Sequence, residues 1–384
     1  MREKERLGVV NLRVTWFSGR SLDSDLAAST EMGLGKALCD HGVYLHFVSP
    51  SVKRRLEFSE QTSLKNCNFP GMKAISGGLS ARKIIKENPR IMEDSDVNII
   101  DWRLVPTLNN SLRRSKIPWL IIDRGPPAYD GILAKAQKIL WKRAWSISEE
   151  HSSGGFVVSE KHAEYVRKYT GATNSTEIRA ITAGTDVRNF PARTKGLGNI
   201  MKIVYIGRVD RNRGIDGIFP LVDVLEKENI RCTIYIAGEG NMISNLKSRA
   251  MNDGIVNLQI LGKLERKDVW DLLERCHVGI MPMPNSEIWM TSSPLKLAEY
   301  AAAGLLTIGP NHAGNRISEG DLWSILSDEE NWQEDCVGML LEIWEGGDWG
   351  LVSSRARESA QIIDWGHIAE KLIEDLKELS GANR

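Results

Sequence analysis

The 384-residue sequence has no excess of charge of either sign, because 50 Lys and Arg balance 50 Asp and Glu. No global field therefore favours nucleic acid as a partner. The five cysteines, at positions 39, 67, 232, 276 and 336, form neither a CxxC pair nor a Cys/His cluster with zinc spacing. This absence predicts unpaired thiols in a reducing compartment, for which the cytoplasm is the default.

Long apolar runs and several cofactor motifs are also missing. The start "MREKERLGVVNLRVTWF" is interrupted by Asn11 and Arg13, which predicts neither a signal peptide nor a membrane span. No G-x-G-x-x-G follows an expected opening strand, which argues against a nicotinamide dehydrogenase. The histidines show no ligand spacing, and "DSD" at 23–25 and 94–96 lacks the context of a carboxylate metal site. We therefore expect no metal and no cofactor.

Short β-branched runs alternate with helical patterns along most of the chain, which indicates an α/β fold with parallel sheets. The expected strands lie in 12–18, 43–49, 97–102, 119–124, 154–159, 201–208, 231–240, 256–262, 277–283 and 305–310. The length favours two doubly wound, Rossmann-like domains, with a Gly- and Pro-rich linker near 188–198. We place the N-terminal domain at 1–190, the C-terminal domain at 191–355 and an amphipathic crossover helix at 356–384, which we expect to return to the N-terminal domain. Two such domains facing each other make a ligand cleft at the carboxyl ends of their strands.

Two loops of the second domain have residues suited to phosphate. In "GRVDRNRG", Gly207 ends a strand, and Arg208 and Arg213 stand beside an expected helix start, which suits a diphosphate. A solvated arginine pair is an equally good interpretation of this spacing. In "AGEG", Gly238, Glu239 and Gly240 form a tight turn after the next strand.

The stretch "SSPLKLAEYAAAG" runs from a polar loop into a helix. Lys296 and Glu299 are three residues apart and share one helix face, so Lys296 can meet phosphate and Glu299 can accept from a ribose diol. A surface ion pair is the alternative. Because this helix and both loops follow strand ends in order, we favour one site, to which the backbone at Ser293, Pro294 and Leu295 contributes.

These segments, together with "LQILGKLERKDVWDLLERCHVGIMPMP" and "DWGHIAEKL", give the second half a specific likeness. It resembles the nucleotide-sugar domain of GT-B glycosyltransferases of the retaining family 4 type. "FVVSEKHAEYVRKYTG" and "ITAGTDVRNFP" resemble the family's last N-terminal strand and helix and its linker, and before residue 150 the likeness is only topological. The resemblance implies sugar transfer from a nucleotide donor with retention and without a metal.

By this resemblance, Arg208 and Arg213 hold the donor diphosphate and stabilise the leaving charge, and Glu299 is the second glutamate of the family's Glu-x7-Glu motif. The first glutamate is absent, because Thr291 occupies its position. Glu287, in the same loop, is the candidate substitute for contacts to the donor sugar. No protein nucleophile is required if the departing phosphate deprotonates the acceptor.

Members of this family commonly have a Gly-Gly turn after the first strand and a His near the acceptor, and this sequence has other residues at both places. The turn is "FSGRSLDSD", so Gly19 and Arg20 are expected to line the cleft. Asp123 and Arg124, in "WLIIDRGPP", are expected where the His usually stands, with Asp123 a catalytic candidate. A helix or turn cap is an equally good interpretation of Asp123.

The segment 132–145 is basic and amphipathic. Its expected apolar stripe consists of Ile132, Leu133, Ala136, Ile139, Leu140 and Ala144, beside Lys135, Lys138, Lys142 and Arg143. We favour a buried crossover helix with a basic outer face. The alternative is a peripheral contact with an anionic membrane, which would suit a lipid-linked acceptor.

We expect a glycosyltransferase that uses a UDP- or GDP-sugar and a glycan, lipid-linked or small-molecule acceptor, with no nucleic-acid partner. The expected location is the cytoplasm or the inner face of the membrane. Three rivals stay open at this point: an epimerase or hydrolase on the same fold, a nucleotide-sugar binding protein without turnover, and, less favoured, the dehydrogenase.

Overall fold

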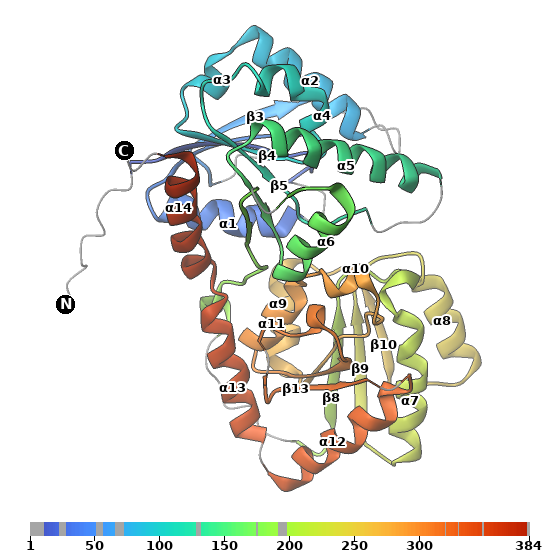
Figure 1. Cartoon of the computed structure of the whole chain (residues 1–384). Helices are drawn as coiled ribbons and strands as arrows, with labels where there is room; N and C mark the ends of the chain where they lie inside the picture. Colours follow the sequence, from blue (N-terminus) through green and yellow to red (C-terminus); the bar gives the residue numbers. More distant parts are fainter. Residues whose placement is uncertain are drawn as a thin grey trace, which may run out of the picture. The chain divides into compact units, whose positions relative to one another are not determined.

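The computed structural model describes residues 11–22, 28–50, 57–65, 73–127, 132–173, 176–190, 198–318, 320–328, 330–347 and 349–381. The chain forms two compact units (Figure 1). Unit 1 comprises Met1–Thr182 and Trp365–Arg384, and unit 2 comprises Ala183–Asp364. Each unit contains one parallel sheet, so the predicted class of two Rossmann-like α/β domains is confirmed.

The sheet of unit 1 has seven strands in the order β3-β2-β1-β4-β5-β6-β7. Their bounds are Arg13–Phe17 (β1), Tyr44–Pro50 (β2), Glu60–Leu64 (β3), Val97–Asp101 (β4), Trp119–Ile122 (β5), Gly155–Val157 (β6) and Ile178–Ala180 (β7). The helices are Ser29–Asp40 (α1), Lys73–Glu87 (α2), Arg90–Glu93 (α3), Val105–Leu112 (α4), Ile132–His151 (α5), Glu160–Thr170 (α6) and Trp365–Ser380 (α14). The central strands β1, β4 and β5 are buried almost throughout, as strands covered on both faces must be.

Helices cover both faces of this sheet. α2, α4, α5 and α6 follow one another along one face, and α1 and α14 pack together on the other (Figure 1). The contact between α1 and α14 is close, since a Cβ at Gly33 would lie 2.3 Å from the indole nitrogen of Trp365. An ion pair of 2.5 Å between Arg179 and Asp375 also ties α14 to β7. The carboxyl-terminal helix is therefore part of unit 1.

The sheet of unit 2 has six strands in the order β10-β9-β8-β11-β12-β13. Their bounds are Met201–Ile206 (β8), Cys232–Ala237 (β9), Leu258–Gly262 (β10), Val278–Ile280 (β11), Leu306–Pro310 (β12) and Ser324–Ser327 (β13). The α-helices are Ile218–Lys227 (α7), Ile243–Asn252 (α8), Arg266–Arg275 (α9), Glu287–Met290 (α10), Leu295–Ala302 (α11), Trp332–Gly346 (α12) and Trp349–Ile362 (α13). Short 3-10 turns follow β8 at Arg211–Arg213 (η3) and β12 at Ala313–Asn315 (η5). The apolar core lies between this sheet and its helices.

Three strands were not predicted: β3, β7 and β13. β3 ("EQTSL") and β13 ("SILS") are polar edge strands of their sheets, and β7 ("IRA") is very short. Edge strands bury one side at most and need no apolar run. The ten predicted strands all occur, most of them one or two residues shorter than expected.

The division between units falls at residues 182/183 and 364/365, whereas the sequence suggested 190 and 355. The expected single crossover helix is two helices, because α13 ends at Ile362 and α14 begins at Trp365. α13 belongs to unit 2, where Arg357 donates to the carbonyl oxygens of Ala302 and Ala303 at the end of α11. The periodicity of the tail did not reveal this break, since both helices are amphipathic.

The apolar stripe predicted for 132–145 is partly wrong. Ile139 is 68% exposed and Ala136 is also exposed, while Ala134, Trp141 and Trp145 are buried. The indoles of Trp141 and Trp145 occupy the buried side of α5. The side of the helix that faces the sheet therefore differs from the predicted apolar stripe. Its outer side carries Lys135, Lys142 and Arg143 around Ile139.

No helix in the described ranges is both long and apolar enough to cross a membrane. The described cysteines, Cys39, Cys232, Cys276 and Cys336, form no disulfide with one another. Cys67 and the carboxylates at 23–25 lie outside the described residues.

Candidate functional site

Glycines bring three strand-end loops of unit 2 into backbone contact at the carboxyl edge of its sheet. A Cβ at Gly238, after β9, would lie 1.7 Å from the carbonyl oxygen of Gly207, after β8. A Cβ at Gly214 would lie 1.8 Å from the carbonyl oxygen of Pro282, after β11. Gly207, Gly214 and Gly238 all have positive φ, which a side chain would disfavour. These glycines therefore let the three loops pack closely as one surface. We call this surface of Gly207, Gly214 and Gly238 the glycine floor.

Lys296 lies beside this floor, in the first turn of α11. Its side chain is 7% exposed, and its Nζ has no hydrogen-bond partner among the described residues. The Nζ lies 3.9 Å from the centre of the Tyr205 ring and 3.9 Å from the place of a Cβ at Gly207. Burial lowers the pKa of Lys296 well below its usual range, and the positive Arg213 lowers it further. A buried ammonium without an anion is a costly feature, and it marks a site for one.

Arg213 is the second cation at this point. Its guanidinium lies 5.0 Å from the centre of the Trp289 ring, and Trp289 donates from Nε1 to the carbonyl oxygen of Asn212 at 2.8 Å. The short helix α10 thereby holds the loop that carries Arg213. Arg208 is oriented differently, since it forms ion pairs with Asp210 at 3.1 Å and Glu239 at 3.6 Å. The structure thus brings Arg213 and Lys296 together and engages Arg208 with carboxylates.

Glu299 stands one turn after Lys296 and is 8% exposed. Burial raises the pKa of this carboxyl, while the charge of Arg266 at the start of α9 acts in the opposite direction. Within the described residues no donor is bonded to its carboxylate. Both oxygens can therefore accept hydrogen bonds from an added diol.

The loop between α10 and α11 uses several of the predicted side chains internally. Thr291 is buried and donates to the carbonyl oxygen of Ile288 at 2.7 Å. The Ser293 hydroxyl accepts from the backbone N–H of Ala183 at 2.8 Å, and Pro294 precedes α11 in extended conformation. Glu287 is exposed in the first turn of α10. Of these, the backbone before Leu295 and the side chain of Glu287 can face a ligand.

In unit 1, charged groups gather at the carboxyl ends of β1 and β4. Ser18 donates to Glu31 at 3.1 Å, and the backbone N–H of Gly19 donates to Asp101 at 3.3 Å. Arg103 binds both carboxylate oxygens of Asp101, each at 3.2 Å.

Arg20 lies 4.0 Å from Glu31, which is fully buried. Burial raises the pKa of Glu31 to about 7, Arg20 opposes this effect and Asp101 adds to it. This network fixes the turn that holds Gly19 and Arg20.

Asp123, after β5, is fully buried. It accepts hydrogen bonds from the indoles of Trp141 at 2.5 Å and Trp145 at 3.0 Å, and His162 Nε2 lies 3.5 Å away. Although burial alone would raise it, the pKa of Asp123 is lowered to about 2 by His162 and the two indoles. This carboxylate holds α5 and α6 to the sheet, so we give it a positioning role.

Arg124 is also tied into the fold, because it donates to the carbonyl oxygen of Ile181 at 2.7 Å. Burial lowers the pKa of its guanidinium to about 10.

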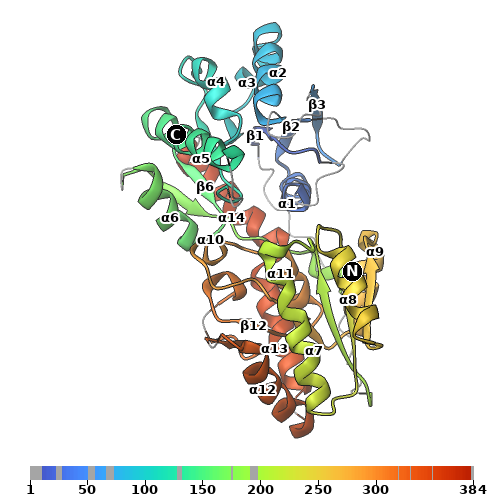
Figure 2. The same cartoon turned by 90° about the vertical axis from the view of Figure 1, so that its right-hand side faces the viewer.

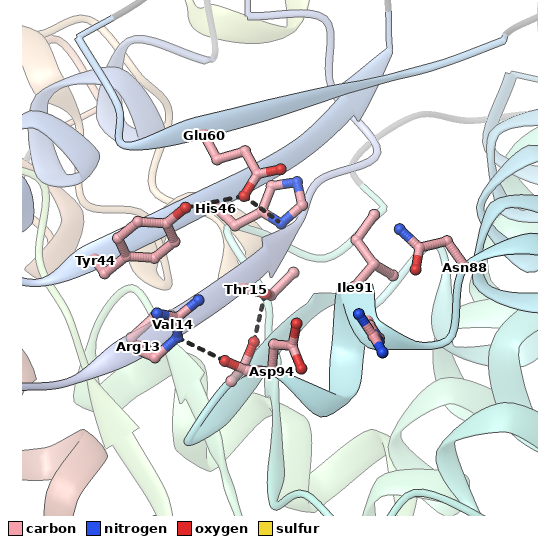
Figure 3. A pocket seen from close by; sticks show the side chains of 11 residues that line it. Arg13, Val14, Thr15, Tyr44, His46, Glu60, Asn88, Ile91 and Asp94 are labelled. Atoms are coloured by element: carbon pink, nitrogen blue, oxygen red, sulfur yellow. Dashed lines mark hydrogen bonds and ion pairs between the residues drawn. The ribbon is translucent and has the colours of Figure 1, made fainter.

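A small pocket of unit 1 lies at the opposite, amino-terminal ends of the strands (Figure 3). Glu60 accepts from the Tyr44 hydroxyl at 3.0 Å and faces His46 at 3.7 Å, and the Arg13 guanidinium lies 4.4 Å from the Tyr44 ring centre. Asp94, from the "DSD" at 94–96, lines it, yet no three His, Cys, Asp or Glu side chains of the described chain gather as a metal site. Its polar groups bond one another, so the pocket gives no sign of a ligand.

Several groups that surround the predicted residues were not predicted from the sequence. Tyr205 and Trp289 lie under Lys296 and Arg213, Arg266 lies near Glu299, and Glu31 and Asp101 support Gly19. The one usable signal was "IIDWR" at 99–103, a carboxylate and an arginine directly after a buried strand. The other contacts join positions far apart in the chain.

Known proteins resemble this chain in sequence over one segment and in fold over nearly its whole length. Residues 169–333, under half of the chain, match the family model described as glycosyl transferases group 1. No curated protein sequence matches the chain. Sucrose-phosphate synthase from Thermosynechococcus elongatus has a similar structure, with a TM-score of 0.77 at 13% identity, covering 97% of this chain and 100% of that one.

Two further solved structures are similar. Anabaena HepE, solved with UDP and glucose, gives a TM-score of 0.73 at 12% identity, covering 96% of this chain and 100% of that one. A glycosyltransferase from Rickettsia africae gives 0.72 at 14% identity, covering 96% of this chain and 98% of that one. By fold the chain is a GT-B protein, and residues 169–333 have the sequence pattern of group 1 glycosyl transferases.

Proposed function

We propose that this protein is a glycosyltransferase whose unit 2 binds a UDP- or GDP-sugar. The observation that carries the proposal is Lys296, a buried cation without a partner in the described chain, beside Gly207 and Arg213. A donor diphosphate supplies the two negative charges that this pair lacks. The group 1 sequence match over 169–333 and the GT-B fold support the same conclusion.

In this proposal each group of the floor has one task. Gly207 leaves space beside Lys296 where the diphosphate can approach the backbone, and Gly238 lets the loop after β9 pack against Gly207. Lys296 and Arg213 bind its oxygens and stabilise the charge that develops as the sugar departs, so fixed cations act in place of a metal. Glu299 accepts from the two ribose hydroxyls, and Glu287 meets the sugar.

We propose that the transfer retains the anomeric configuration. The acceptor hydroxyl attacks from the face that the diphosphate leaves, and a departing phosphate oxygen takes its proton. The C1–O bond to phosphate breaks as the new C1–O bond forms, so no protein nucleophile is needed. For unit 1 we propose the Gly19–Arg20 turn and Arg124 as contacts to the acceptor. The four described cysteines form no disulfide, which fits a reducing compartment, for which we take the cytoplasm.

A second candidate is a nucleotide-sugar binding protein without turnover. It is favoured by Thr291, which stands in place of an acidic residue and turns its hydroxyl into α10. In that case the diphosphate contacts persist and the donor sugar is not activated.

A thermal-shift screen of UDP, GDP, ADP and their common sugars tests the proposal. One nucleotide should raise the melting temperature of the wild type, and Lys296→Met and Glu299→Gln should each abolish most of that rise. Lys247→Met, an exposed lysine on α8, is the matched control and should behave as the wild type. No rise with any nucleotide would contradict the proposal.

Donor turnover separates the two candidates. A slow release of free sugar from the selected nucleotide sugar, lost in Lys296→Met, indicates a transferase that uses water as a poor acceptor. Binding with no release, and no transfer to any of a panel of sugar, lipid and phenolic acceptors, indicates the binding protein.

A further inference from the structure

Three neighbouring helices concentrate positive charge on one face of unit 1. α2, α4 and α5 lie side by side over the sheet (Figure 2). Residues 73–87, 105–116 and 132–151 hold eleven Lys and Arg against three Glu, although the whole chain has a net charge of zero. Positive charge is therefore segregated here and balanced elsewhere in the molecule.

The cations point outward and most lack a carboxylate partner. We call the following exposed residues the basic face: Arg82, Lys83 and Lys86 on α2, Arg113, Arg114 and Lys116 after α4, and Lys135, Lys142 and Arg143 on α5. Across the described ranges, only Lys83 among them has an ion-pair partner, Glu87 at 3.6 Å. The remaining eight cations can meet an external anionic surface.

Aliphatic side chains stand among these cations. Ile75 is 41% exposed, Leu79 is 54% exposed and Ile139 is 68% exposed. Leu79 lies one turn before Arg82 and Lys83, and Ile139 lies between Lys135 and Lys142 on the outer side of α5. Lysines and arginines around aliphatic residues suit the interface of an anionic bilayer. No aromatic residue belongs to this set, whereas single-stranded nucleic acid is bound largely by aromatic stacking.

The opposite face of unit 1 lacks this excess of positive charge. On α14 the exposed acids Glu370, Glu374 and Glu378 stand against Lys371 and Lys377. On α1, beside it, Lys36 pairs with Asp40 at 3.2 Å. A negative surface would therefore attract the basic face more strongly than this side, so unit 1 has one favoured orientation on it.

We propose that the basic face docks unit 1 on an anionic phospholipid bilayer, with Leu79 and Ile139 entering the headgroup region. The partner is the lipid surface itself. The proposal extends beyond the donor site and does not depend on it, because no residue of the basic face contributes to the Lys296 site in unit 2.

Flotation of the full-length protein with vesicles tests the proposal. Vesicles of phosphatidylcholine with about 30 mol% phosphatidylglycerol should bind the protein at about 0.1 M NaCl and release most of it at about 0.5 M, and pure phosphatidylcholine should not bind it. Lys142→Glu/Arg143→Glu should weaken binding at least tenfold. The control Lys247→Glu/Lys371→Glu makes the same change in net charge elsewhere and should keep most of the binding.

Three other outcomes would contradict the proposal. It fails if anionic vesicles do not bind the protein, if both double variants lose equally, or if duplex DNA binds through these residues while vesicles do not. Leu79→Asn/Ile139→Asn should weaken binding several-fold with unchanged salt dependence, and equal affinity would contradict insertion. The nucleotide-induced thermal shift of each variant should equal that of the wild type, which separates lipid docking from the donor site.

Discussion

Buried ionisable side chains lie at the carboxyl edges of both sheets. In unit 2, Lys296 is held in a dry position over the Tyr205 ring by the first turn of α11. In unit 1, Glu31 is enclosed near Ser18, Asp101 and Arg20. Each group destabilises the free fold in its charged form, and such strain is common where a protein has a binding function.

Lys296→Met should make the free protein more stable by about 1–3 kcal/mol, because it replaces a buried charge with an apolar chain of similar length. The pKa of Lys296 is lower in the folded state than the unfolded value of 10.5. Between these two pKa values the unfolded state binds more protons than the folded state. The free energy of unfolding of the wild type therefore rises as the pH increases toward 10.5. The variant should lack that component of the rise. Urea denaturation between about pH 7 and pH 10 measures both effects. Lower stability of Lys296→Met at pH 7 would mean that Lys296 has an internal partner.

Glu31→Gln should flatten the stability profile on the acidic side. Burial raises the pKa of Glu31 to about 7 in the folded state from its ordinary value of 4.5, so the folded state keeps a proton that the unfolded state releases. Wild-type stability should fall by about 3 kcal/mol relative to the variant as the pH rises from 4.5 through 7. Denaturation of both proteins at several pH values provides the difference. Parallel profiles would show that Glu31 titrates normally.

At the scale of elements, glycine positions determine how helices and loops approach. Gly33→Ala on α1 would place its methyl carbon 2.3 Å from the Trp365 indole nitrogen, so α14 must shift. We expect a loss of about 1–3 kcal/mol and faster proteolysis near residue 364. Gly338→Ala on α12 is the matched control, since nothing lies within 4 Å of its Cβ, and it should stabilise the protein by about 0.5–1 kcal/mol. Equal effects of the two substitutions would contradict the packing of α1 on α14.

The order of buried elements could be predicted from the sequence, because apolar runs such as "MKIVYI" need burial on both sides. The loops with Gly207, Gly238 and Lys296 were also predictable, since they follow those strands. The partners of these residues were not. Tyr205 lies under Lys296, and Trp141 donates to Asp123, because of packing between distant segments, which no local pattern contains. The phase of α5 failed for the same reason, as its tryptophans pack against distant residues.

At the scale of the whole molecule, the two units have separate chemical characters. Unit 2 places cations beside glycine loops suited to a diphosphate, and unit 1 concentrates exposed positive charge on one of its two faces. The proposals for the donor and for the lipid surface therefore involve different units. Substitutions on the basic face should change lipid binding, and substitutions at the Lys296 site should change nucleotide binding. The two effects can therefore be measured independently.

The most direct test of the central claim is calorimetric titration of UDP and UMP into the wild type and Lys296→Met. If Lys296 and Arg213 bind the diphosphate, the wild type should prefer UDP by about 10- to 100-fold, the range expected for charge-assisted hydrogen bonds. Lys296→Met should lose most of that preference while still binding UMP. An unchanged UDP preference in Lys296→Met would contradict the account.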